Sequence, residues 1–218
     1  MNLPHSPLPT RLCLIRHGET AWNTERRIQG QLDIPLAPTG RAQARAVARR
    51  LANTPFAAIY ASDLARALST AQAVAERLKL PVETAAALRE RHYGALQGST
   101  YAEFEQRYPQ DYARFLTREE TFALPGGGES LRAFADRVNR GVDAIVAAHP
   151  GQTALLVTHG GVLDILRRRA CNRPLNTPRD FEIPNAGINW LEVDRGAWTL
   201  LAWAERGHLD RALDELPG

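Results

Sequence analysis

Two short segments, far apart in the sequence, place a histidine directly after a run of apolar residues. LCLI is followed by Arg16, His17 and a glycine, and ALLVT is followed by His159 and Gly160. A third apolar run, FAAIYAS, leads into DLAR, which ends at Arg66. A planar guanidinium can bind two phosphoryl oxygens, and a neutral imidazole is a competent nucleophile toward phosphorus. If the fold brings these side chains together, they form a site for a phosphoryl group.

Phosphoryl transfer also needs a proton for the departing oxygen. A carboxylic acid can supply it if it stays protonated near neutral pH. Glu90, in LRERHYG, is our candidate for this acid, and Glu19 competes because it lies close to His17 in the sequence. The glycine after each histidine allows close backbone approach, and free N–H groups at a helix start favour an anion.

Metal binding is the rival use of two histidines. The sequence contains no HExxH and no close cluster of His, Asp and Glu at ligand spacing, and the adjacent arginines would repel a cation. A single histidine is more often a structural residue than a catalyst. The repetition of strand, histidine and glycine at two distant places favours a catalytic site without a metal.

Composition narrows the class of protein. The chain has 218 residues and a formal net charge of only +3, so a general nucleic-acid surface is not indicated. Two cysteines do not make a disulfide framework, and we expect Cys13 in the core. The first ten residues resemble neither a secretion signal nor a membrane anchor, and no apolar stretch is long enough to span a bilayer. We therefore expect a cytoplasmic protein that binds neither membranes nor nucleic acid.

The elements that must position these residues alternate between short apolar runs and amphipathic segments. This pattern predicts an α/β fold, with a mostly parallel central sheet flanked by helices on both faces. In parallel sheets the carboxyl ends of the strands share one edge, where ligands bind, so His17, His159 and Arg66 would meet there. We expect one domain over 1–218 with a helical cap insertion at about 97–128, and Thr39 as a helix N-cap. The expected strands are 11–15, 56–62, 81–86 and 154–158, with an antiparallel pair at 185–193 and 198–203, and the expected helices are 39–53, 63–78, 129–149 and 161–170.

Taken in order, the motifs of this chain resemble those of the histidine phosphatase superfamily, the group of phosphoglycerate mutases and their phosphatase relatives. The resemblance extends from about residue 12 to residue 161. It rests on RHGETAWN, RIQGQLDIPLAPTG, SDLARALSTA, a glutamate before YGALQG, GGES and VTHGG.

This resemblance implies roles for individual residues. His17 would become a phosphohistidine, and Arg16, Arg66 and His159 would form the phosphate pocket. Glu90 would be the acid toward the leaving group and then the base that activates water. Four further residues lie in matching motifs and would contact the phosphate: Asn23, Gln29, Gly30 and Gly160.

Mutases and phosphatases of this family share that pocket. Arg91 and Tyr93 match residues that touch substrate in the mutases that depend on bisphosphoglycerate. However, the cap lacks the lysine and arginine pair of those mutases, and residues 99–124 hold three arginines and five acidic residues, a net charge of −2. An acidic cap would disfavour a substrate with two anionic ends. The mutases also have Asn where this chain has Gly161, and this chain has no obvious counterpart to their long C-terminal tail.

We therefore expect a phosphomonoesterase that acts on a small phosphorylated metabolite, without a cofactor. The alternative is a phosphoglycerate mutase that uses 2,3-bisphosphoglycerate as its cofactor. A module that binds a phosphorylated ligand without catalysis is the third possibility, and it is disfavoured because every catalytic position is filled. A homodimer is compatible with the sequence.

Overall fold

The structure, a computed structural model, describes residues 8–210, and its centre is a six-stranded sheet with the strand order β3-β2-β4-β1-β5-β6. Strands β1 to β4 run parallel, whereas β5 and β6 form an antiparallel pair at one edge. The predicted sheet and the predicted antiparallel pair are both confirmed. The strands are β1 (Thr10–Arg16), β2 (Ala58–Ala61), β3 (Val82–Thr84), β4 (Thr153–Thr158), β5 (Ile188–Asp194) and β6 (Ala197–Glu205).

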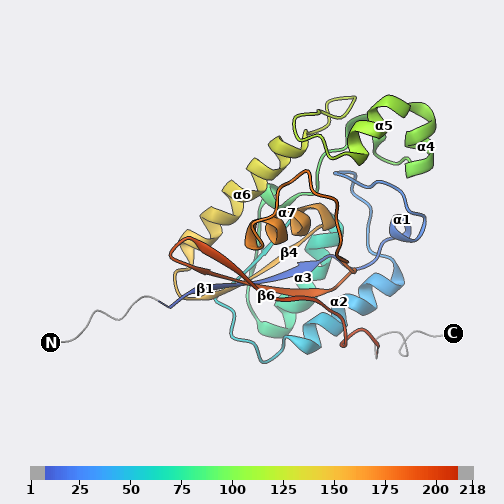
Figure 1. Ribbon diagram of the computed structural model, residues 1–218. Helices are drawn as coiled ribbons and strands as arrows, with labels where there is room; N and C mark the ends of the chain where they lie inside the picture. Colours follow the sequence, from blue (N-terminus) through green and yellow to red (C-terminus); the bar gives the residue numbers. More distant parts are fainter. Residues whose placement is uncertain (1–7, 211–218) are drawn as a thin grey trace.

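Helices cover both faces of the sheet, as predicted (Figure 1). Successive side chains of a strand point to opposite faces. In β1, Leu12 and Leu14 therefore pack with α6 (Leu131–Ala148) and α7 (Gly160–Ala170). Cys13 and Ile15 pack on the other face with α2 (Pro38–Arg50) and α3 (Ala65–Leu78). The parallel strands are thus packed between two buried hydrophobic clusters, one on each face of the sheet.

The register of β1 against β4 decides where the two histidines lie. Arg16 and Thr158, the last residues of the two strands, pair with each other, so a histidine follows each strand at the same level. The N–H of His17 still donates to the carbonyl of Thr158 at 2.9 Å. β2 pairs with β4 on the other side and ends at Ala61, opposite Val157. The three chain segments therefore leave the sheet at one edge.

The segment expected as a cap contains α4 (Tyr101–Arg107) and α5 (Pro109–Leu116), which lie together at one end of the molecule (Figure 1). Phe104 is completely buried in a separate small cluster with Ile28, Leu96, Phe122 and Leu124. A bridge between Arg27 and Thr100 joins this cluster to the loop that contains α1 (Ala21–Thr24). Two short 3-10 turns, Ala86–Leu88 and Gly94–Leu96, lead from β3 into the cap.

Some predicted helix boundaries are wrong. Thr39 does not cap α2, because the helix already begins at Pro38, whose ring presets the helical φ, after Ala37. α2 also ends at Arg50 rather than Asn53. α3 begins at Ala65, because Asp63 remains outside it and forms an ion pair with Arg89 at 2.5 Å.

The prediction for residues 1–10 and the comparison with the C-terminal tail of the mutases concern residues that lie mostly outside the described range of 8–210. Within that range, none of the helices is both long enough and apolar enough to cross a membrane.

Candidate active site

The two predicted histidines meet at the carboxyl edge of the sheet. Their ring centroids are 5.1 Å apart, and the rings are tilted by 58°. Both side chains are buried, at 3% exposure for His17 and none for His159. His159 is also the N-cap residue of α7, so it stands where the helix N-terminus favours an anion.

The hydrogen bonds of His17 define which nitrogen can react. Its Nδ1 lies 2.7 Å from the carbonyl oxygen of Gly18, which can only accept, so Nδ1 carries the proton. The lone pair therefore remains on Nε2. Burial, with further contributions from Arg66 and Arg16, holds the pKa of His17 well below its usual value. The imidazole is neutral at pH 7, as a nucleophile must be.

His159 is neutral for the same reasons. Burial is the main cause that lowers its pKa, followed by the charge of Arg66. Neither of its ring nitrogens has a hydrogen-bond partner among the described residues. A buried imidazole without partners is costly, and an oxygen of a bound phosphoryl group would satisfy its N–H.

The two arginines are oriented by backbone carbonyls. Arg66 donates from Nη1 to Leu32 at 2.8 Å and from Nη2 to Gly30 at 2.6 Å. Arg16 donates from Nη1 to the carbonyl of Ile183 at 2.6 Å. The Nε–H of each is buried and has no partner among residues 8–210. Burial lowers the pKa of Arg66 to about 10, so it is still a cation at neutral pH.

The loop after His17 supplies further polar groups. The Oδ1 of Asn23 accepts from the backbone N–H of Thr20 at 3.0 Å, which leaves its amide NH2 as the group it can offer to a ligand. Gln29 is buried, and its Oε1 has no partner in the described chain. Gly30 uses its carbonyl to hold Arg66, so it contributes through that side chain.

Glu90 stands between the sheet edge and α7. Its Oε2 accepts the backbone N–H of Gly161 at 2.9 Å, and its Oε1 accepts that of Arg91 at 2.8 Å. Each oxygen has a second lone pair for a proton or a substrate atom. Glu90 lines the same cavity as His17, whereas Glu19 does not. The arrangement favours Glu90 over Glu19 as the acid.

Two residues that sequence reasoning missed hold this arrangement together. Asn185 donates from Nδ2 to the carbonyl of His17 at 3.0 Å and to Oδ1 of Asn23 at 3.3 Å. Arg137 on α6 donates to the carbonyls of Ala87, Arg89 and Glu90. Asn185 follows a proline in an irregular segment, and Arg137 lies on an amphipathic helix, so neither carried a recognisable signal.

The reacting groups line a cavity of about 260 Å³ that includes Arg16, His17, Arg66, Glu90 and Tyr93. Of the other predicted contact residues, Asn23, Gln29 and Gly30 line it as well. A second cavity of about 240 Å³ shares Arg16, Glu90, Tyr93 and Tyr101 with the first and contains Arg91 and Gly160. All the predicted residues except His159 therefore line one of two adjoining spaces that share Glu90. His159 lines neither space, and it is fully buried with its ring 5.1 Å from that of His17.

The inference from the acidic cap is wrong for the cavity. Glu103, Glu119 and Glu120 form ion pairs with Arg27, Arg114 and Arg132, and none of the three lines the second cavity. Arg118, by contrast, lines that cavity. The net charge of a segment does not give the charge that faces a ligand, because side chains of opposite sign point in different directions.

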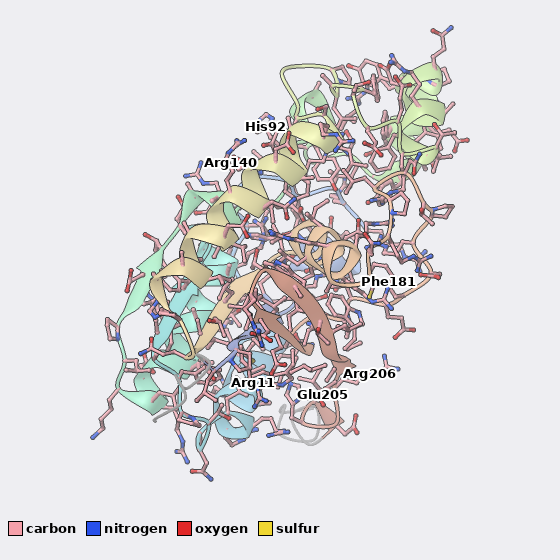
Figure 2. The ribbon with its side chains drawn as sticks, turned by 60° about the vertical axis from the view of Figure 1, so that its left-hand side comes forward. Arg11, His92, Arg140, Phe181, Glu205 and Arg206 are labelled. Carbon is pink, nitrogen blue, oxygen red and sulfur yellow. The ribbon has the colours of Figure 1, made fainter. Side chains whose placement is uncertain are left out.

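The other described histidines lie away from this site. His92 packs beside the start of α6, where Glu129 binds its backbone N–H at 2.8 Å (Figure 2). His149 contacts Tyr60, and His208 lies 3.0 Å from the carbonyl of Ala186, so both are partly buried rather than free on the surface. Residues 8–210 contain no group of three or more His, Cys, Asp or Glu residues that could hold a metal ion.

The fold and the paired histidines define a class of phosphoryl-transfer proteins, and comparison with known proteins agrees. The profile of the histidine phosphatase superfamily (branch 1) matches residues 12–206, and the chain belongs to this family. The sequence predicts a site without a metal, and one relative, described below, is named as metal-independent, which is consistent with that prediction.

Three relatives illustrate the range within the family. Phosphoglycerate mutase-like protein 4 of Arabidopsis thaliana is 41% identical over 202 residues, 91% of this chain and 86% of that protein. The metal-independent phosphoserine phosphatase of the same plant is 37% identical over 92% of this chain and 83% of its own length. The structure of a mycobacterial glucosyl-3-phosphoglycerate phosphatase superposes with a TM-score of 0.81 at 34% identity, covering 91% of this chain and all of that one. The chain thus belongs to a family of enzymes that includes phosphatases and mutases.

Proposed function

We propose that this protein hydrolyses the phosphomonoester of a small metabolite through a phosphohistidine intermediate on His17. The observation that carries the proposal is the hydrogen bond from Nδ1 of His17 to Gly18, which leaves Nε2 as the free nucleophile in a cavity with two buried guanidiniums. The phosphatase names of two relatives support hydrolysis, since they share at least 34% of their residues with this chain.

In the first step, Nε2 of His17 attacks phosphorus while the bond from phosphorus to the ester oxygen breaks. Glu90 transfers a proton to that oxygen, and the alcohol leaves. Arg16, Arg66 and the N–H of His159 stabilise the charge on the three equatorial oxygens, where electrostatic stabilisation has its largest effect.

In the second step, Glu90 takes a proton from water as the water oxygen attacks phosphorus. The bond between phosphorus and Nε2 breaks, and inorganic phosphate leaves. Glu90 is then protonated again and His17 is neutral, so both groups return to their starting states.

The decisive experiment combines turnover with trapping. Wild-type protein and His17→Ala are assayed with p-nitrophenyl phosphate, and the wild type is quenched during turnover of a 32P-labelled phosphomonoester. We expect His17→Ala to be inactive and the label to be stable in alkali and labile in acid, as a phosphoramidate is. Equal turnover by the two proteins, or label on another side chain, contradicts the mechanism.

The same protein distinguishes hydrolysis from transfer. One relative is named as mutase-like. Incubation with 3-phosphoglycerate, with and without 2,3-bisphosphoglycerate, should release inorganic phosphate in both cases. Conversion to 2-phosphoglycerate that depends on the bisphosphate and releases little phosphate would establish the mutase alternative instead.

A further inference from the structure

The second cavity adjoins the phosphate pocket on the side of Glu90, where the leaving group of the proposed reaction must lie. Glu90 and Arg16 line both cavities, and so do the rings of Tyr93 and Tyr101. An ester oxygen protonated by Glu90 would therefore have its organic part in the second cavity. The walls of this cavity define the substrates that the site accepts.

Three arginines from separate segments line this cavity in addition to Arg16. Arg91 follows Glu90, Arg118 comes from the cap, and Arg179 lies in the connection between α7 and β5. The same three arginines line a neighbouring hollow of about 400 Å³, together with one carboxylate, that of Glu119, which is paired with Arg114. The three arginines are therefore shared by both spaces.

Among the described residues, Arg91 is a buried cation without a carboxylate that forms an ion pair with it. Only 7% of it is exposed, and its Nε and Nη2 both donate to the carbonyl of Glu129. The carboxylate of Glu129 is instead bound by Arg137 at 2.8 Å. Nη1 of Arg91 is therefore left for another acceptor. A buried cation whose hydrogen bonds go to a neutral carbonyl gains from an anionic ligand.

Arg118 and Arg179 retain donors in the same way. Arg118 uses Nε for the carbonyl of Leu175 and Nη2 for Oδ2 of Asp164, both at 2.6 Å, so its Nη1 remains. Arg179 is exposed and makes no hydrogen bond or ion pair with the rest of the described chain.

The balance of charge in the cavity is positive. It is lined by four arginines and by two carboxylates, those of Glu90 and Asp164. Asp164 is already neutralised, because its Oδ2 binds Arg168 at 3.0 Å as well as Arg118. Its Oδ1 is buried and has no partner within residues 8–210. A ligand in this cavity thus meets mainly hydrogen-bond donors that suit an anion.

We propose that this cavity binds a carboxylate on the leaving group, and that Arg91, Arg118 and Arg179 make the enzyme selective for phosphorylated hydroxy or amino acids. The inference rests on the proposed phosphatase function. The cavity has a volume of about 240 Å³, which suits a compact leaving group. Phe115, Leu131 and Phe134 also line it and would contact the carbon atoms of that group.

Matched substrates test the carboxylate directly. O-phosphoserine carries a carboxylate that O-phosphoethanolamine lacks, and glycerol 3-phosphate has a neutral hydroxymethyl group where 3-phosphoglycerate has its carboxylate. We expect the wild type to favour the carboxylated member of each pair by at least tenfold in kcat/KM. In Arg179→Ala and Arg118→Ala this ratio should fall by about tenfold or more, because each loses a charge-assisted contact.

Controls separate charge from structure. Arg179→Lys keeps the charge and should retain a larger part of the ratio than Arg179→Ala. Arg107 is an exposed arginine of α4 outside the cavity, so Arg107→Ala should leave the ratio unchanged. Arg118 also binds Asp164, so its loss removes a structural contact as well as a charge. Arg179 is exposed and makes no such contact within residues 8–210. The Arg179 variants are therefore decisive.

A wild-type ratio near one, or a ratio that Arg179→Ala leaves unchanged, overturns the carboxylate site. Neither result touches the phosphatase proposal, provided that p-nitrophenyl phosphate is still hydrolysed and that this hydrolysis requires His17. If the wild type hydrolysed none of the phosphomonoesters, that result would instead contradict the proposed function itself.

Discussion

At the scale of single residues, the site depends on keeping two imidazoles neutral among cations. Burial is the largest cause of the low pKa of both His17 and His159, and the guanidinium of Arg66 adds to it. The same two factors that make His17 a nucleophile also oppose its protonation in mild acid. The fold therefore maintains uncharged histidines at a pH where free imidazoles are protonated.

The low pKa of these two histidines makes the stability of the protein depend on pH. The unfolded imidazoles have a pKa of about 6.5, so below that pH the unfolded chain binds protons that the folded chain excludes. The free energy of unfolding should therefore fall with decreasing pH, by up to about 1.4 kcal/mol per pH unit for each histidine.

Urea unfolding of the wild type, His17→Asn and His159→Asn between pH 7.5 and pH 5 measures this dependence. Each substitution should make the pH dependence shallower, since one of the two buried imidazoles is gone. A wild-type slope retained in both variants would show that these histidines do not exclude protons in the folded state.

At the scale of elements, glycines let backbone segments approach where side chains would not fit. A Cβ on Gly18 would lie 2.4 Å from the carbonyl oxygen of Gly40 at the start of α2. The close packing of this loop against the start of α2 therefore requires a glycine after His17, independently of any contribution to anion binding. At α7, a Cβ on Gly161 would lie 2.1 Å from Oε1 of Glu90 and 3.1 Å from the ring of Phe134. The missing side chain leaves Glu90 room against the helix.

Gly161→Ala should therefore displace Glu90 without unfolding the protein, because the clashing atom is the end of a flexible side chain. We expect kcat for alkyl phosphates to fall by about 10²-fold, and that for p-nitrophenyl phosphate much less, since a good leaving group needs little protonation. Glu90→Gln should show the same pattern across leaving groups.

Gly160→Ala is the matched control. Its Cβ would lie 3.7 Å from Nε of Arg16 and 4.0 Å from Oε2 of Glu90, which are ordinary contact distances. The fall in kcat caused by Gly160→Ala should be smaller than that caused by Gly161→Ala, and it should be the same for alkyl and aryl phosphates. Equal losses for alkyl and aryl phosphates in Gly161→Ala would contradict the positioning of Glu90 by this glycine.

At the scale of the whole molecule, the cap and the body share ion pairs that also border the site. Arg118 of the cap binds Asp164 on α7, and Asp164 binds Arg168, which is only 1% exposed. The connection after α7 packs on the same helix, where Arg167 stacks on Phe181, seen beside α7 and β6 in Figure 2. The cap therefore has a defined position relative to the sheet edge.

Removing the shared carboxylate should destabilise the protein. In Asp164→Ala, Arg168 is left as a buried cation without its partner, which costs about 3 kcal/mol of unfolding free energy or more. Asp143, whose side chain is 51% exposed, forms an ion pair with Arg169, and Asp143→Ala should cost less than about 1 kcal/mol. Urea unfolding of the three proteins measures both effects, and equal stabilities would show that Asp164 does not join cap to body.

The sequence by itself determined the sheet, its helices and the meeting of His17, His159 and Arg66. A strand followed by a histidine is a local pattern, and parallel strands end at a common edge whatever lies between them. Glu90 was identified with help from a family resemblance, and its position beside α7 agrees with that choice.

Only the tertiary structure decided which of the other polar residues face the cavities. Asn185, Arg137, Arg118 and Arg179 lie in irregular segments or on amphipathic helices, where a charged residue is expected in any case. Their direction depends on contacts with residues far away in the sequence, such as that between Arg118 and Asp164. For this reason the composition of the cap predicted an acidic surface, whereas the packed molecule presents arginines to the space beside Glu90.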